Sequence, residues 1–268
     1  YGRAIIENRP RGNCLIIGAW NYPIELSLKP LIGSISAGNN TTIVFPDLEY
    51  TKYTSTLLIN LFNKYFKHIQ NINVQIGGKH NVTELLKNKW DFIFYTGSLH
   101  VGKIIYKQAA ENLTPVVLEL GGKSPCIVER QYNMHLLIKR ILWGKLTNCG
   151  QTCISPDYFL VNENFGNEFI KLLKKIIYEF YGKKIKYNDD YGRIVNRNAY
   201  DRLINIINND KHYIEYGGEY CNEELFIEPT IINFKGNKTT FLKSKCMENE
   251  IFGPIIPVYY FKTYDEVN

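Results

Sequence analysis

The stretch "NCLIIGAWNYPIELSLKPLIGSISAGNNTTIVF" (13–45) decides the fold. It opens with a short apolar run, which predicts a strand. Pro23 near a first turn and Gly38 at an end predict a helix over 23–38. The run "TTIVF" (41–45) then predicts a second strand. A strand, a helix and a strand at this spacing predict a βαβ unit with parallel strands.

The same alternation continues on the C-terminal side of this unit. Further strands are predicted at 72–77, 91–97, 115–120, 158–161, 227–232 and 255–261, and helices at roughly 50–67, 80–88, 101–112, 132–145, 164–181 and 197–208. The glycines and the proline of "LGGKSP" (120–125) interrupt the pattern and predict a domain boundary there. We therefore expect an α/β protein with a largely parallel sheet.

Composition excludes several classes of protein. A chain of 268 residues with 22% charged residues and 45% hydrophobic residues is typical of globular proteins with one or two domains. The net charge of +6 is mild, and the densest basic stretch, 171–187, is typical of an amphipathic helix with a solvated lysine face. Membrane-surface or nucleic-acid binding by this stretch is the minority alternative, and we expect no nucleic-acid partner. No apolar run reaches about 18 residues, so no spanning helix is predicted.

The cysteines and the chain ends indicate an intracellular fragment. The six cysteines lie in contexts such as "NCLIIGAW" and "SPCIVE", which favour buried free thiols over a disulfide framework. No two of the five histidines have ligand spacing, so no metal site is expected. The chain starts at Tyr1 and stops at Asn268 just after a predicted strand, so we interpret it as a piece of a longer protein.

A glycine-containing turn follows the predicted strand 91–97. In "YTGSLHVGKII" (95–105), Gly97 and Gly102 allow close approach of a ligand to the backbone. The start of the next helix offers N–H groups and a positive dipole end, which suits a dinucleotide phosphate. An ordinary glycine-containing turn between strand and helix is the alternative.

Two polar residues lie where predicted strands end. Asn21 precedes the helix predicted from Pro23, and is either its N-cap or an amide donor in a site, beside Trp20 as a packing residue or cofactor wall. Glu119 lies at the end of an apolar strand, where burial would raise its pKa toward that of a general base. A salt bridge of Glu119 with Lys123 is an equally weighted alternative.

Two further segments carry candidate chemistry. In "NCGQTC" (148–153) the cysteines 149 and 153 lie one turn apart if the stretch is helical. A reactive thiolate with a nearby base is chemically coherent, and a buried inert cysteine is the alternative. In "EIFGP" (250–254), Glu250 and Phe252 form either a simple turn or a ribose-binding carboxylate with an aromatic neighbour.

Taken in order, several segments resemble the aldehyde dehydrogenase superfamily, most closely its class 3, fatty-aldehyde type. They are "WNYP" (20–23), "LTPVVLELGGKSP" (113–125), "WGKLTNCGQTC" (143–153), "DYGRI" (190–194) and "EIFGP" (250–254). The resemblance covers essentially the whole chain. It implies a doubly wound, parallel-sheet NAD(P)-binding domain over 1–121, with its N-terminal part missing, and an α/β catalytic domain over 122–268, with its C-terminal part missing.

The resemblance also implies a reaction. An aldehyde would be oxidised to a carboxylic acid with NAD or NADP. Cys153 would be the nucleophile, with Cys149 a bystander, and would form a thiohemiacetal and then a thioester. The Asn21 amide and the Cys153 backbone N–H would stabilise the oxyanion. Glu119 would activate the water that releases the acid.

Cofactor contacts and departures follow from the same resemblance. The residues expected to contact the cofactor are Trp20, Gly97, Ser98, Leu99, His100, Val101, Gly102, Glu250 and Phe252. Glu250 would hold the nicotinamide ribose, and Phe252 would flank that end. Phe45 stands where the family has a lysine and Leu48 where it has a glutamate, both for the adenosine ribose, with Asp47 as a partial substitute. The choice between NAD and NADP stays open.

Two alternatives of function remain. One is a non-catalytic homologue with a structural or binding role, and the other is a reductase of acyl thioesters or acyl phosphates, against which Glu119 argues. The resemblance further implies a homodimer when the chain is full length. It also implies a cytoplasmic location, or the cytosolic side of the endoplasmic reticulum membrane if the full chain carries a C-terminal anchor.

Overall fold

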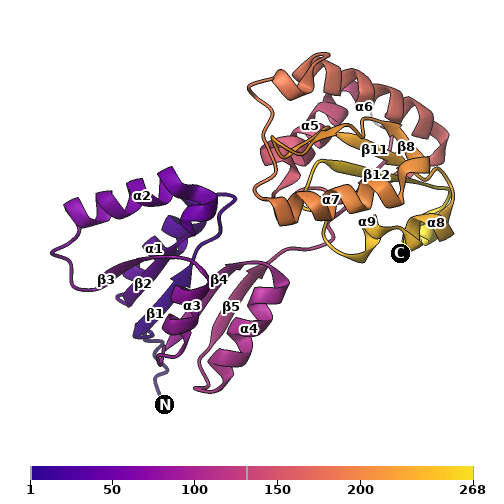
Figure 1. Cartoon of the computed structure of the whole chain (residues 1–268). Helices are drawn as coiled ribbons and strands as arrows, with labels where there is room; N and C mark the ends of the chain where they lie inside the picture. Colours follow the sequence, from indigo (N-terminus) through magenta and orange to yellow (C-terminus); the bar gives the residue numbers. More distant parts are fainter. Residues whose placement is uncertain (1, 131, 268) are drawn as a thin grey trace. The chain divides into compact units, whose positions relative to one another are not determined.

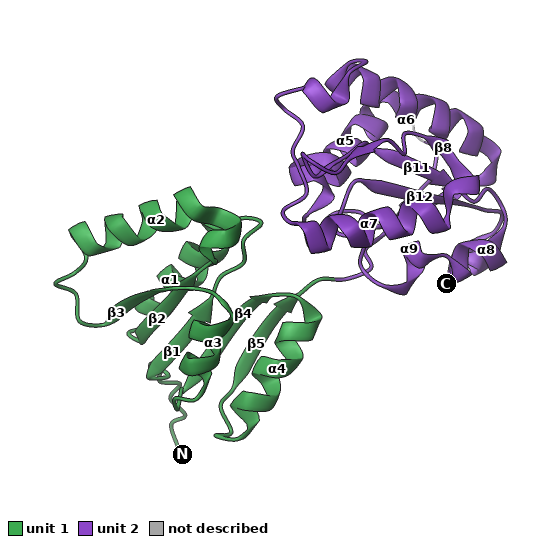
Figure 2. Ribbon diagram, in the orientation of Figure 1, with its two compact units in different colours: residues 1–121 green, residues 122–268 purple. Residues whose placement is uncertain are grey.

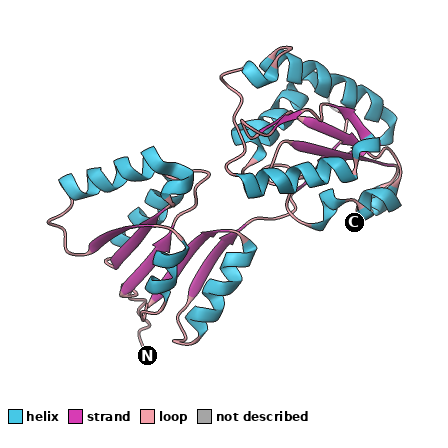
Figure 3. Cartoon of the chain, in the orientation of Figure 1, coloured by secondary structure: helices cyan, strands magenta, loops and turns pink. Residues whose placement is uncertain are grey.

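Short apolar runs form the strands of this protein, and the longer segments between them form helices (Figure 3). The computed structural model describes residues 2–130 and 132–267. Contacts between residues divide the chain into two compact units, Tyr1–Gly121 and Gly122–Asn268 (Figure 2). Each unit holds its own sheet with helices packed around it.

Unit 1 is a doubly wound parallel sheet (Figure 1). Its strand order is β3-β2-β1-β4-β5, and every neighbouring pair is parallel. This order confirms the α/β fold predicted from the alternation of strands and helices. The elements are β1 (Asn13–Ile17), α1 (Glu25–Ser36), β2 (Asn40–Phe45), α2 (Leu48–Tyr65), β3 (Ile72–Ile76), α3 (Lys79–Leu86), β4 (Phe92–Gly97), α4 (Leu99–Ala110) and β5 (Val116–Leu120).

Successive residues of the central strand β1 pack in two different hydrophobic cores. Leu15 packs in a cluster with Ile105 of α4, whereas Ile16 packs in a second cluster with Leu31 of α1 and Leu58 of α2. Side chains of a strand alternate between its faces, so the two clusters lie on opposite sides of the sheet. Both faces of β1 are therefore covered, which explains why this central strand is apolar without alternation.

The direction in which the strands are added reverses between β1 and β4. From β1 the chain proceeds through β2 to β3 on one side, and then returns to place β4 and β5 on the other side. In doubly wound sheets, ligands bind beyond the carboxyl ends of the two strands at this reversal. The segments after Ile17 and after Gly97 therefore flank the expected ligand crevice of unit 1.

Unit 2 has a mixed sheet of order β6-β7-β12-β11-β8, in which only β8 runs antiparallel to its neighbour. A large apolar cluster surrounds this sheet. Its elements are β6 (Pro125–Val128), α5 (Met134–Leu146), η1 (Thr147–Gly150), β7 (Tyr158–Asn162), η2 (Glu163–Phe165), α6 (Gly166–Tyr181), η3 (Ile185–Tyr187), α7 (Arg197–Asn209), η4 (Lys211–Tyr213), β8 (Ile214–Tyr216), β9 (Tyr220–Cys221), β10 (Phe226–Ile227), β11 (Thr230–Asn233), α8 (Lys238–Lys243), α9 (Lys245–Glu248), β12 (Ile255–Phe261) and η5 (Tyr264–Glu266).

The lysine-rich stretch 171–187 is helical only in its first part. Helix α6 buries Phe169, Leu173 and Ile176 at helical spacing, as an amphipathic helix should. It ends at Tyr181 because Gly182 adopts a left-handed φ of 71°. The helix predicted over 164–181 is therefore confirmed, whereas the description of the whole stretch 171–187 as one amphipathic helix is wrong beyond Tyr181, because the lysines after Gly182 lie in a loop and in η3.

Candidate active site

The turn after β1 carries Asn21. Helix α1 begins at Glu25, and its N-cap position is Ile24, which makes no side-chain cap. The interpretation of Asn21 as the N-cap is therefore wrong, because the helix starts later than Pro23 suggests. Within the turn, a Cβ on Gly18 would lie 2.2 Å from the Ser27 Oγ. The turn thus lies directly on α1 and holds Asn21 at the carboxyl end of β1.

Trp20 has a packing partner on α2. Its ring centroid lies 6.4 Å from that of Tyr50, and the side chain of Trp20 is half-buried. The packing contact and a role as a cofactor wall are compatible, since only part of the ring is covered. The second role stays a prediction.

Gly97 ends β4 and Gly102 lies in the first turns of α4, and each packs against a neighbouring side chain. A Cβ on Gly97 would lie 2.2 Å from the Tyr95 hydroxyl, and a Cβ on Gly102 would lie 2.8 Å from the Leu120 side chain. Gly102 therefore lets α4 approach β5 closely. These contacts give both glycines a packing role, and the start of α4 is the feature that favours a phosphate contact.

The first turn of helix α4 lies at the point where the strand order reverses, between β1 and β4. Ser98 is its N-cap, and the Ser98 Oγ accepts the Val101 backbone N–H at 3.3 Å. The side chains of Leu99 and His100 are exposed. A helix start with a positive dipole end at this position fits an anionic dinucleotide phosphate. Unit 1 therefore places these residues and Asn21 at the same edge of one sheet.

The residues at the positions expected to bind the adenosine ribose of a dinucleotide differ from the family pattern. Phe45 is completely buried at the end of β2, with its ring centroid 5.6 Å from that of Phe62. Asp47 is the N-cap of α2, and its Oδ1 accepts the Glu49 N–H at 3.0 Å. Leu48 is 39% exposed. A core aromatic therefore fills the lysine position, and Asp47 already has a structural role.

Glu119 is exposed, and the burial expected for it is wrong. It lies on the edge strand β5, where Val117 and Glu119 share the exposed face and Leu118 packs toward the core. The apolar composition of the strand hid this alternation. The proposed salt bridge is also wrong, because the Lys123 ammonium pairs with Asp157 instead.

In unit 2, the two cysteines of "NCGQTC" do not lie on one helix. Helix α5 ends at Leu146, and η1 follows with left-handed φ angles of 52° at Asn148 and 59° at Cys149. Such angles are uncommon for residues other than glycine. The condition under which the cysteines would lie one helical turn apart is therefore not met, because the backbone is not helical between them.

The environments of these two thiols differ. Cys149 is 1% exposed, and burial raises the pKa of its thiol to about 12. Cys153 lies in the turn after η1 and is partly exposed. Both are free thiols, as are the other cysteines, Cys14, Cys126, Cys221 and Cys246. Because the thiolate is the reactive form, Cys153 is the better candidate nucleophile of the pair.

A partly buried lysine and a buried aspartate hold the segment that precedes "EIFGP". The Lys123 ammonium donates to a carboxylate oxygen of Asp157 and to the carbonyls of Cys246 and Asn249. The other Asp157 oxygen accepts the Ile251 N–H at 2.9 Å. Asp157 is 3% exposed, whereas the Lys123 side chain is 25% exposed, so water reaches only the lysine of this pair. Neither role was inferred from the sequence, where the only signal was a charge beside the apolar run of β7.

A second cation completes this support. The Arg202 guanidinium donates to the carbonyls of Glu250 at 3.3 Å and Ile251 at 2.6 Å. The Glu250 carboxylate is half-buried and accepts the Gly122 N–H, and burial raises its pKa to about 7. Phe252 follows with a left-handed φ of 49°. The backbone that carries Glu250 and Phe252 is thus fixed from several directions.

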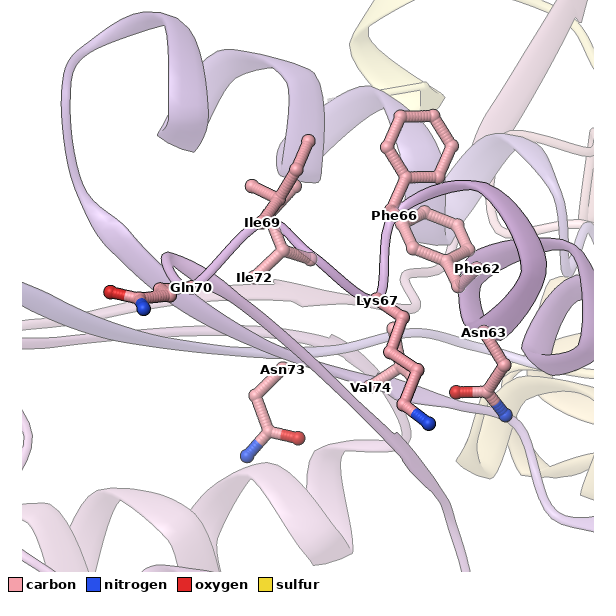
Figure 4. A pocket seen from close by; sticks show the side chains of 9 residues that line it. All are labelled: Phe62, Asn63, Phe66, Lys67, Ile69, Gln70, Ile72, Asn73 and Val74. Carbon is pink, nitrogen blue, oxygen red and sulfur yellow. The ribbon is translucent and has the colours of Figure 1, made fainter.

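The described surface has open pockets in both units. One of about 400 Å³ lies between the end of α2 and β3, where Phe62 and Phe66 lie beside Lys67 (Figure 4). It includes Ile72, the first residue of β3, so it lies at the opposite end of the sheet from the expected crevice. Another, of about 540 Å³, adjoins η1 and is lined by Trp143, Phe180, Tyr181, Asp189 and Asp190, among others.

The described part of the chain offers neither a cluster of metal ligands nor a helix suited to a membrane. No group of three or more His, Cys, Asp or Glu residues in 2–130 and 132–267 is placed to hold a metal ion. None of the helices in that part of the chain has the length and apolar character needed to cross a membrane.

Known proteins resemble this chain over nearly its whole length. Residues 2–268 match the aldehyde dehydrogenase family. The chain is 43% identical over 264 residues to aldehyde dehydrogenase family 3 member A2 of Pongo abelii, and the match covers 98% of this chain and 52% of that protein. It is 42% identical over 261 residues to the Mus musculus protein named aldehyde dehydrogenase, dimeric NADP-preferring, covering 97% and 55%.

A solved structure agrees in fold. The substrate-bound state of Staphylococcus aureus AldH matches with a TM-score of 0.87 and 42% identity, over 97% of this chain and 55% of that one. The chain therefore spans about half the length of the curated relatives it matches.

Proposed function

This chain belongs to the aldehyde dehydrogenase family, and from that premise we propose that the whole protein oxidises an aldehyde to a carboxylic acid, with NAD or NADP as the hydride acceptor. Unit 1 would bind the cofactor, and unit 2 would supply the nucleophile. Medium or long aliphatic aldehydes and aromatic aldehydes are the proposed substrates.

The main support for the proposal is the difference in exposure between the two thiols of "NCGQTC". Cys149 is buried with a pKa of about 12, whereas Cys153 is partly exposed. The Cys153 thiolate would attack the aldehyde carbon, which forms a C–S bond and places negative charge on the oxygen. The Cys153 backbone N–H and the Asn21 side-chain amide would donate hydrogen bonds to this oxyanion.

The C–H bond of the thiohemiacetal would then break and leave a thioester on Cys153. A bound nicotinamide would supply the acceptor for the hydride that is lost. Glu119 would take a proton from a water molecule, whose oxygen attacks the thioester carbon. The C–S bond breaks, and the products are the carboxylic acid and the Cys153 thiolate. The exposure of Glu119 supports this role, because a general base must meet water.

The fit of a dinucleotide rests on the architecture of unit 1. The N-terminus of α4 lies at the reversal of strand order, where Gly97, Ser98, Leu99, His100, Val101 and Gly102 would hold the phosphates. Trp20 would form a wall, Glu250 would bind the nicotinamide ribose, and Phe252 would flank that end. The buried Phe45 leaves no lysine for the adenosine ribose, so selection between NAD and NADP falls to other residues.

The test uses the full-length protein. Aldehyde-dependent formation of reduced cofactor is followed by absorbance, with NAD and NADP supplied separately, for wild type, Cys153→Ser and Cys149→Ala. We expect turnover in wild type and Cys149→Ala and none in Cys153→Ser. Folded wild type that reduces neither cofactor with any aldehyde would favour the non-catalytic homologue. Oxidation of reduced cofactor by acyl thioesters, without aldehyde oxidation, would favour the reductase.

Assembly and location are further parts of the proposal. A homodimer is supported by the word "dimeric" in the name of the Mus musculus relative. A cytoplasmic location is proposed, or the cytosolic side of the endoplasmic reticulum membrane if the full chain carries a C-terminal anchor. Light scattering of the full-length protein would measure its mass, and cell fractionation would separate the two locations.

A further inference from the structure

The loop that carries the candidate nucleophile has an unusual backbone. We call residues 148–153 the nucleophile loop. Asn148, Cys149 and Gly150 all have left-handed φ angles, of 52°, 59° and 75°. Successive left-handed residues are costly and persist only where the surroundings hold them. Some other part of unit 2 must therefore hold this loop in place.

The side chain of Gln151 makes that connection. It is 2% exposed, and its amide nitrogen donates to the Asn148 carbonyl and to the Arg193 carbonyl, each at 3.0 Å. Its amide oxygen accepts the Val195 N–H at 2.9 Å. Both amide protons and the amide oxygen are therefore used. One bond closes the loop on itself, and two join it to a segment more than forty positions later.

That distant segment, 190–195, is itself firmly held. It contains "DYGRI", which resembles the family but had no role of its own in the sequence. The Tyr191 hydroxyl donates to the Ile227 carbonyl at 2.8 Å. The Arg193 guanidinium donates to the Lys186 carbonyl at 2.6 Å and to Glu224 at 3.0 Å. Gln151 thus joins the nucleophile loop to a rigid support.

We propose that Gln151 is the positioning residue of the catalytic thiol: its amide fixes the loop backbone that carries the thiol and the backbone N–H of Cys153. This inference rests on the proposed function, in which Cys153 is the nucleophile. The chemistry of the side chain is specific. A glutamate would have the same shape, but its carboxylate would face two carbonyl oxygens and could donate to one of them only when protonated.

Three variants of the full-length protein test the proposal. Gln151→Glu keeps the shape and makes donation depend on pH, whereas Gln151→Met keeps the volume and removes all three bonds. The control is Asn233→Leu, because Asn233 is another buried amide of unit 2, bonded to the Tyr260 hydroxyl and the Lys235 N–H. For each, the rate of Cys153 alkylation by iodoacetamide is measured from pH 6 to 8.5 by peptide mass spectrometry, beside kcat and KM.

We expect Gln151→Glu to alkylate about tenfold more slowly than wild type at pH 8, with kcat reduced more than KM is raised. The ratio to wild type should recover as the pH falls toward 6, because the protonated side chain donates again. Gln151→Met should be slow at every pH, and Asn233→Leu should lose stability but keep the wild-type alkylation rate.

Equal alkylation of wild type and Gln151→Glu at pH 8 would overturn the inference. So would a pH-independent deficit shared with Asn233→Leu, because that pattern indicates general destabilisation. The two proposals fail separately. If wild type shows no turnover but Cys153 alkylation still depends on Gln151, only the proposed function is refuted. If all the variants turn over normally, only the positioning role is refuted.

Discussion

The backbone of Gly150 lies against the carbonyl of Gly253, so that a Cβ on Gly150 would be 2.3 Å from that oxygen. The two glycines belong to segments about a hundred positions apart, "NCGQTC" and "EIFGP". This contact joins the proposed nucleophile loop to the proposed ribose-binding segment. Position 150 requires glycine for two reasons, which are the lack of space for a Cβ and the left-handed φ of 75°.

Gly150→Ala should therefore destabilise the protein strongly. The new methyl group would have to displace the Gly253 carbonyl as well as adopt a strained φ, and we expect a loss of at least about 2 kcal/mol in the free energy of unfolding. Gly38→Ala is the matched control, because Gly38 has a φ of 81° but nothing closer than 3.7 Å to its Cβ position. It should lose only about 1 kcal/mol. Urea unfolding of both variants gives the comparison, and equal losses would contradict the packing argument.

The two cysteines of the nucleophile loop should label very differently. At pH 8, iodoacetamide should modify Cys153 within minutes and leave Cys149 unmodified, because burial raises the Cys149 pKa to about 12. Peptide mass spectrometry distinguishes the sites. Cys246, whose pKa burial also raises to about 12, is the internal control for an inert buried thiol. Labelling of Cys149 at the rate of Cys153 would show that the loop opens in solution.

Glu250 should make stability depend on pH. Burial raises its pKa in the folded protein from 4.5 to about 7. Its contribution to stability is therefore complete below pH 4.5 and is lost as the pH rises through 7, because the unfolded state ionises first. Between pH 5 and 8, wild type should lose about 1–2 kcal/mol relative to Glu250→Gln, after allowance for solvent screening. Parallel urea titrations at several pH values measure this difference, and a constant difference would refute the assignment.

Lys145 should oppose folding at neutral pH. It is 1% exposed, and burial lowers its pKa from 10.5 to about 8. Its contribution to stability is complete above pH 10.5 and is lost as the pH falls through 8, when the ammonium must charge inside the protein. Lys145→Met should thus be more stable than wild type by about 2–3 kcal/mol at pH 7.

The same variant has a built-in control in its pH dependence. The advantage of Lys145→Met should shrink between pH 8 and 10, where the wild-type lysine becomes neutral in the folded protein. Thermal or urea unfolding across that range measures it. A variant less stable than wild type at pH 7 would indicate that the Lys145 ammonium is stabilised by Asp157 and Glu250 more than burial penalises it.

Prediction succeeded where periodicity is long and failed where it is short. Every strand and helix of unit 1 was predicted to within a few residues, as was the fully apolar strand β12. The strands β8 to β10 and the helices α8 and α9 were missed, because elements of two to six residues contain less than two helical turns or too few alternations. The short antiparallel strand β8 depends on its pairing with β11 for its existence.

The sequence by itself determined the α/β class, the parallel sheet of unit 1 and the identity of the candidate residues, because hydrophobic periodicity and local glycine chemistry are properties of neighbouring residues. Tertiary structure alone decided the environment of each residue. It exposed Glu119 on an edge strand, buried Cys149 but not Cys153, and gave Gln151 partners more than forty positions away. Burial and hydrogen bonding between distant segments arise only when the chain folds back on itself, and no local pattern encodes them.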